Sequence, residues 1–221
     1  KFRSKCEISR VLLLSDGQAN VGPSTAEELG RYGAMLMKDG IAVSTVGLGN
    51  GYNEDLMTRL SQKSDGNSYY VADSKGLTKV FAFELGDVLS VAATKVQLKV
   101  RFGEGFVPVQ LVGRDGRIAD GVVTIDLNQL YGGQEKYVIV KCDAAPGKAG
   151  DARETAKAEV SYDDATSGGQ RVATGVAAVT YSSDAAAVAA SVNRNVVKER
   201  VLNENALRLE SAIRAADKGD F

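Results

Sequence analysis

The first ninety residues alternate three times between a strand-like run and a longer segment with helical periodicity. Residues 10–15 and 41–47 are nearly continuous apolar runs, and 68–71 is a third short strand-like segment. A strand without polar alternation is typical of a sheet that is covered on both faces. Strands that alternate with helices form parallel sheets through right-handed crossovers. The pattern therefore predicts an α/β unit in this part of the chain.

Capping residues mark the starts of the helices between these strands. Ser24 and Glu27 are predicted to form a capping box, Asn53 to cap a helix over 54–63, and Ser74 to cap a helix over about 76–90. The residues expected to face the sheet are Leu29, Gly33, Leu36 and Met37 in the first helix, Leu56, Met57 and Leu60 in the second, and Leu77, Val80, Phe81, Leu85 and Leu89 in the third.

The hydrophobic period changes near residues 92–94. Residues 95–102 alternate polar and apolar side chains, which predicts a strand with one face in water. Further strands separated by Gly-rich turns are expected over about 106–112, 121–127, 135–142, 155–162 and 170–181, a pattern that favours an antiparallel β-sandwich. From Asp184 to about Asp217 the chain is expected to be helical, with its apolar positions packed in a core: Val188, Val192, Val196, Leu202, Leu207 and Ile213.

These patterns predict three parts: residues 1–92 in an α/β unit, 93–182 in the β-sandwich, and 183–221 in a helical segment.

The composition limits the possible classes of function. Lys and Arg number 27 against 28 Asp and Glu, so bulk charge favours neither a nucleic acid nor a membrane surface as partner. The chain has no His, which excludes a His-assisted catalytic triad within it. No window reaches the roughly 18 apolar residues of a membrane span.

Two cysteines, Cys6 and Cys142, lie far apart without metal-ligand spacing. We expect two unpaired thiols, although a single bridge between them stays open. No compartment is assigned from them.

The segment with the most chemical content is Ser15-Asp16-Gly17, which directly follows the first apolar run. A carboxylate at the carboxyl end of a buried parallel strand lies where open α/β sheets bind ligands. Asp16 is therefore the candidate metal-binding residue. The competing interpretation is that Asp16 only caps the following loop.

The pattern strand-Ser-Asp-Gly-x-Ala-Asn-x-Gly, followed by a helix and then Ile-Ala-Val-Ser-Thr-Val-Gly-Leu-Gly, resembles the second half of a bacterial von Willebrand factor type A (VWA) domain. It is most similar to the subgroup described as calcium-activated chloride channel-like. The resemblance implies half of a doubly wound, Rossmann-like sheet, followed by the β-rich and helical regions. Proteins of this type are often exported or anchored in bacterial membranes.

The resemblance also implies a site for Mg²⁺, or for Mn²⁺ or Ca²⁺, built from three loops. Only the third loop has a match here, at Asp16; the first loop's Asp-x-Ser-x-Ser and the second loop's Thr do not precede it. We therefore expect that this chain alone does not hold the ion, and that the missing amino-terminal half of the domain is its partner. The expected further partner is a protein that offers a carboxylate. The apolar strand at 11–14 should present an open edge.

Other candidate sites have simpler interpretations. Residues 47–51 lack the Lys-Ser/Thr of a phosphate-binding loop and are expected to form a strand-to-helix turn, with Asn20 and Asn50 as loop-capping residues near the metal edge. Asp163 and Asp164 lack the alternating carboxylates of a calcium loop and are expected in a hairpin turn.

Three functions stay open. The favoured one is a non-enzymatic, divalent-cation-dependent protein-binding module. The second is a structural assembly protein with a degenerate metal site. The third is a Mg²⁺-dependent phosphoryl-transfer enzyme, which would need a second Asp at position 18, where this chain has Gln18.

Overall fold

A computed structural model describes residues 9–16, 18, 21–49 and 52–219. The chain forms two compact units. The first contains Lys1–Val96, Leu127–Glu135 and Ser161–Arg171, and the second contains Gln97–Asp126, Lys136–Val160 and Val172–Phe221. These units follow spatial compactness and cut across long strands, so the three-part division along the chain stays a prediction.

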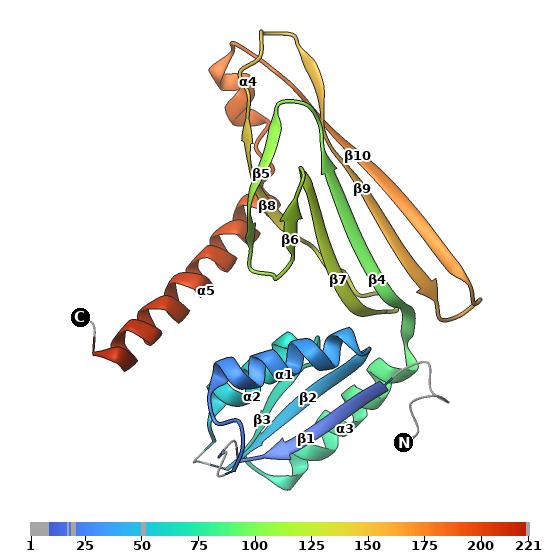
Figure 1. The fold of residues 1–221 in the computed structure, drawn as a ribbon, viewed down its shortest axis with the longest axis vertical. Coiled ribbons are helices and arrows are strands. Elements are labelled where there is room, and N and C mark those ends of the chain that lie inside the picture. The colour runs from blue at the N-terminus through green and yellow to red at the C-terminus, as the bar shows by residue number, and fades with distance from the viewer. Residues whose placement is uncertain (1–8, 17, 19–20, 50–51, 220–221) are drawn as a thin grey trace. The chain divides into compact units, whose positions relative to one another are not determined.

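A three-stranded parallel sheet forms the predicted α/β part, in the order β1-β2-β3. Helices cover both of its faces, with α1 and α2 on one side and α3 on the other (Figure 1). The predicted alternation of strand and helix is confirmed. In chain order the elements are β1 (Ser9–Ser15), α1 (Ala26–Lys38), β2 (Ile41–Leu48), α2 (Glu54–Lys63), β3 (Ser68–Val71) and α3 (Ser74–Leu89).

Two of the three predicted helix caps are displaced by one residue. The capping box of α1 joins Thr25 and Glu28, not Ser24 and Glu27. Both pairs have the required spacing, so spacing alone does not separate them. The N-cap of α3 is Asp73, whose carboxylate accepts from the Gly76 N–H at 2.9 Å, and not Ser74.

The cap predicted for α2 is confirmed, because the Asn53 side chain accepts from the Leu56 N–H. The predicted inward residues of α2, Leu56, Met57 and Leu60, are buried as well.

The apolar face predicted for α3 is partly wrong. Val80 is buried, but Phe81, Leu85 and Leu89 are exposed. The inward position one turn after Val80 belongs to Glu84, which is only 5% exposed. Hydrophobic periodicity alone does not identify this carboxylate as an inward residue, because its burial depends on partners from other elements.

Antiparallel strands follow, as predicted. They form a five-stranded sheet in the order β10-β9-β4-β7-β6 and a two-stranded sheet of β5 and β8. The short strand β6 was not predicted from the sequence. The bounds are β4 (Val91–Phe102), β5 (Phe106–Val112), β6 (Arg117–Ala119), β7 (Val122–Tyr131), β8 (Ile139–Ala144), β9 (Ala152–Asp164) and β10 (Gln170–Thr180).

The carboxyl-terminal helical segment consists of two helices, α4 (Ala185–Ala190) and α5 (Arg194–Lys218). The expectation that its apolar residues pack in a core is wrong. Val188, Val192, Val196, Leu202, Leu207 and Ile213 are all exposed in the described chain. Helical periodicity shows which residues share a face, but it does not show that another element covers that face.

Candidate functional site

The candidate site lies where the three parallel strands end. The strand register aligns Ser15 of β1 with Gly47 of β2, and Gly47 with Tyr70 of β3. These three residues form one row across the carboxyl edge of the sheet. Asp16 directly follows this row, so it stands at the edge where open α/β sheets bind ligands.

Two hydrogen bonds fix the position of Asp16. Its carboxylate Oδ1 accepts from the Gln18 N–H at 3.1 Å, and its backbone carbonyl accepts from the Asn53 N–H at 3.1 Å. The first bond is the loop cap that competed with the metal interpretation, and the second ties the loop after β1 to the start of α2. The side chain is exposed, and the described contacts of its carboxylate involve Oδ1 alone.

The described residues do not by themselves fit a divalent cation. No group of three or more Asp, Glu, Cys or His side chains comes together within the described ranges. One carboxylate is too few, because Mg²⁺ requires octahedral oxygen coordination. Gly17, Asn20 and Asn50 lie outside the described residues. The role of Asp16 as a metal ligand stays a prediction.

An aromatic pair beside Asp16 was missed by the sequence analysis. The rings of Tyr52 and Tyr70 lie 5.8 Å apart between centroids, tilted by 34°. Tyr52 occupies the space above Gly47, where an added Cβ would meet its ring at 2.3 Å. Two tyrosines placed just after one strand and within the next were the signal that could have revealed the pair.

Of the turn predicted over residues 47–51, Gly47 and Leu48 still belong to β2, Gly49 follows the strand, and residues 50 and 51 lie outside the described residues. A Cβ at position 47 would force the Tyr52 ring to move, and Gly49 has a left-handed φ of 81°. These observations explain the glycines without a phosphate.

The predicted hairpin turn at Asp163 and Asp164 is also confirmed, because it joins β9 to β10. The Asp164 carboxylate accepts from the Ser167 hydroxyl and from the N–H groups of Thr166 and Ser167. These bonds, led by that of the Ser167 side chain, lower the pKa of Asp164 to about 2. Asp163 forms an ion pair with Lys95 at 2.7 Å.

A buried polar cluster joins α3 to all three strands near their amino-terminal ends. Oε2 of Glu84 accepts from Arg10 and from the Ser44 hydroxyl, each at 2.8 Å. Oε1 accepts from Asn67 at 2.8 Å and from the Tyr69 hydroxyl at 2.9 Å. Four donors therefore fill the acceptor positions of one ionised carboxylate.

Burial alone would raise the pKa of Glu84, but the hydrogen bonds from Asn67 and Ser44 and the charge of Arg10 outweigh it and lower the pKa below its usual value. Burial and the neighbouring Glu84 carboxylate raise the pKa of Tyr69, so its hydroxyl stays a donor. The cluster is charged, and both carboxylate oxygens of Glu84 have hydrogen-bond donors. Because these donors come from several elements, the cluster is suited to holding the sheet together.

Arg10 is the cation of this cluster, and only 6% of its side chain is exposed to solvent. Its guanidinium lies 5.1 Å from the centroid of the Tyr131 ring. Its Nε and Nη2 atoms have no hydrogen-bond partner in the described structure. The Glu84 carboxylate is therefore the main group that offsets the cost of burying the charge of Arg10.

Cys142 is a free, half-buried thiol, while Cys6 lies outside the described residues.

None of the helices in the described ranges is long and apolar enough for a membrane span.

Comparisons with known proteins identify the fold. No protein-family profile matches the chain. A stretch of 101 residues, 45% of this chain, is 31% identical to the uncharacterized protein YfbK of Escherichia coli K12 and covers 18% of it.

Two solved structures are similar over nearly the whole chain. A von Willebrand factor type A protein from Catenulispora acidiphila matches 86% of this chain and 46% of its own, with a TM-score of 0.70 at 14% identity. The ArnB paralog VWA2 from Sulfolobus acidocaldarius matches 90% of this chain and 48% of its own, with a TM-score of 0.52 at 19% identity. The chain thus spans less than half the length of each of these three proteins. The likeness does not reach the chloride channel-like subgroup, which stays a prediction. The chain has the fold of a von Willebrand factor type A protein.

Proposed function

We propose that this chain is part of a VWA-type module that binds a protein partner at the carboxyl edge of its three-stranded sheet, in a divalent-cation-dependent way. The observation that carries the proposal is the position of Asp16. It is exposed, directly follows a strand of a parallel sheet, and uses only one carboxylate oxygen in its described contacts. The proposed ion is Mg²⁺, with Mn²⁺ or Ca²⁺ as substitutes.

The described residues supply one ligand to this ion, so the proposal requires further oxygen ligands from outside them. The proposed source is the amino-terminal half of the same domain. The open edge of β1 supports this, because β1 ends the three-stranded sheet and Val11, Leu13 and Leu14 are exposed there. An apolar edge strand of this kind recruits another strand.

The proposed partner protein offers a carboxylate, since a bound divalent cation with an open coordination position attracts one. A non-enzymatic role is part of the proposal. A phosphatase assay with a general phosphomonoester tests that part, and turnover that disappears in Asp16→Ala would overturn it.

The second candidate is a structural assembly protein with a degenerate site. One observation favours it: Oδ1 of Asp16 is already used in the turn to Gln18. Titration calorimetry with Mg²⁺ or Mn²⁺ on the protein joined to the other half of its domain separates the two candidates. Saturable heat that is lost in Asp16→Ala supports the first candidate, and absence of heat supports the second.

Partner binding is tested by affinity capture in Mg²⁺ and in EDTA, with the wild type and Asp16→Ala side by side. We expect a partner that is retained only by the wild type and only in Mg²⁺. A partner held equally in EDTA and by Asp16→Ala contradicts the cation-dependent function.

A further inference from the structure

The Tyr52–Tyr70 pair is an exposed aromatic surface at the same edge as Asp16. Tyr70 is 52% exposed, and Tyr52 is half-buried against Gly47. The two rings face one another at 5.8 Å. Neither ring belongs to the apolar cluster between α3 and the sheet, which contains Val46, Val71 and Val80 with Leu12, Leu48, Tyr69 and Leu77 around them.

The strand register places this pair beside Asp16. Gly47, under the Tyr52 ring, is paired with Ser15, the residue before Asp16. Adjacent strands lie about 4.8 Å apart, so the Tyr52 ring is about one strand spacing from β1 and Tyr70 about two. The Asn53 N–H, next to Tyr52 in the chain, donates to the Asp16 carbonyl.

The charge around the pair is negative. Glu54 and Asp55 are the first residues of α2, directly after Asn53, and both are exposed. No described ion pair neutralises either of them. Asp73 caps α3 two residues after β3 ends, with Lys75 as the cation in the same helical turn. An aromatic face in negative surroundings attracts a cation and disfavours an anion.

We propose that the Tyr52–Tyr70 pair is a binding site for a cationic side chain, a guanidinium or ammonium group, of the protein partner. This inference deepens the proposed function, because it names a second chemical feature of the partner. The cation stacks on the exposed Tyr70 ring, and Glu54 and Asp55 supply the long-range attraction. A partner that fits both sites carries a carboxylate and, within about 10 Å, a basic residue.

The test uses two small probes of nearly the same shape, the cationic N-acetyl-arginine amide and its neutral analogue N-acetyl-citrulline amide. Each is titrated into the chain in EDTA at low salt, and the ring resonances of the tyrosines are followed by NMR. We expect saturable shifts of Tyr52 and Tyr70 with arginine, and about threefold weaker binding with citrulline. Salt should weaken the arginine response.

Substitutions supply the matched controls. Tyr70→Phe should keep the binding and Tyr70→Leu should lose it, while Tyr32→Leu, which removes an equally exposed tyrosine (51%) on α1, should change nothing. Circular dichroism confirms that each variant is folded. Equal binding of both probes, an equal response of Tyr32, or retained binding in Tyr70→Leu would each overturn the inference. Because no metal is present, its failure leaves the Asp16 proposal standing.

Discussion

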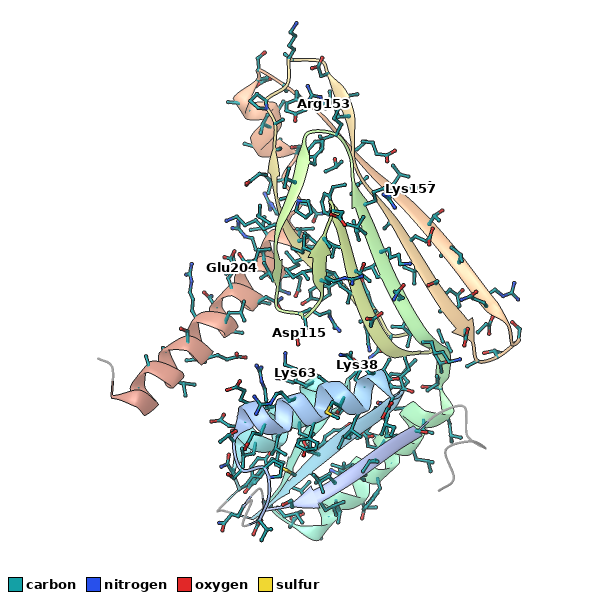
Figure 2. The ribbon with its side chains drawn as sticks, viewed as in Figure 1. Lys38, Lys63, Asp115, Arg153, Lys157 and Glu204 are labelled. Atoms are coloured by element: carbon teal, nitrogen blue, oxygen red, sulfur yellow. The ribbon has the colours of Figure 1, made fainter. Side chains whose placement is uncertain are left out.

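Two sets of contacts around the three-stranded sheet are made in different ways. Around α1 and α2, backbones approach directly. In the turn after α2, a Cβ on Gly66 would lie 2.0 Å from the Val43 carbonyl oxygen of β2, and between the two helices a Cβ on Gly33 would lie 2.6 Å from the Leu60 carbonyl oxygen. On the face of α3, the same sheet meets a valine core at one end and the Glu84 cluster at the other. Figure 2 draws the side chains on the ribbon, with Lys38 at the end of α1 and Lys63 at the end of α2 labelled.

The difference shows two ways to make close contacts around a sheet. Small residues allow close packing that tolerates no added atom, whereas a buried carboxylate needs several donors placed together. The first kind of contact should respond to steric changes, and the second to charge and pH.

The largest expected effect is that of Glu84→Ala. It leaves the buried Arg10 without its main partner, so the free energy of unfolding should fall by about 3–5 kcal/mol. Urea unfolding followed by circular dichroism measures it. The control is Phe83→Ala, which truncates an exposed neighbour on the same helix and should change stability by about 0.5 kcal/mol or less. Similar losses in both variants would show that the cluster does not hold α3.

In the turn between α2 and β3, Gly66→Ala should cost about 1–3 kcal/mol, because the added methyl group collides with backbone atoms of β2 that cannot rotate away. Its counterpart is Gly86→Ala in α3, where the added Cβ would meet no described atom within 4 Å apart from the neighbouring backbone of its own helix. That change should stabilise the protein by about 0.5–1 kcal/mol through helix propensity. Thermal unfolding of both variants tests the pair, and the same sign of change would contradict the comparison.

The pH dependence of stability should separate the two kinds of contact. The pKa of Glu84 is lower in the folded state than its usual value of 4.5, so its contribution to stability is present above about pH 4.5 and is lost as pH falls through the folded pKa. Wild type should therefore lose more stability on acidification than Glu84→Gln does. Gly66→Ala should keep the wild-type slope. Parallel curves for wild type and Glu84→Gln, from urea unfolding at several pH values, would refute this assignment.

The smallest expected effect is that of Asp16→Ala, which removes one exposed turn hydrogen bond. Stability should change by about 0.5 kcal/mol or less. A loss of several kcal/mol in chemical unfolding would mean that Asp16 is a structural residue. That result would favour the second candidate function, a structural assembly protein with a degenerate metal site.

The sequence predicted the parallel sheet well because the runs at 10–15 and 41–47 are decided by local apolar pattern. It also predicted the cap at Asn53, where one side chain satisfies one nearby N–H. It failed at Glu84, whose donors come from residues 10, 44, 67 and 69, because no local pattern shows that these residues meet. The prediction that the apolar residues of α5 pack in a core was also wrong, because no local pattern shows whether another element covers that face.

The candidate site divides in the same way. Asp16 was predicted from the strand that precedes it, and the structure places it at the expected edge. The Tyr52–Tyr70 pair depends on the register between β2 and β3, which the sequence did not supply.

The most direct test is the paramagnetic broadening of backbone amide signals by low concentrations of Mn²⁺, measured on the protein joined to the other half of its domain. We expect the amides of Gln18 and Asn53, both hydrogen-bonded to Asp16, to broaden well before those of other exposed turns of this chain, and Asp16→Ala to remove the effect. The internal reference is the hairpin turn, where Thr166 and Ser167 donate to the Asp164 carboxylate without a proposed metal role. Earlier or equal broadening at Thr166 and Ser167 would contradict the claim that Asp16 marks the binding edge.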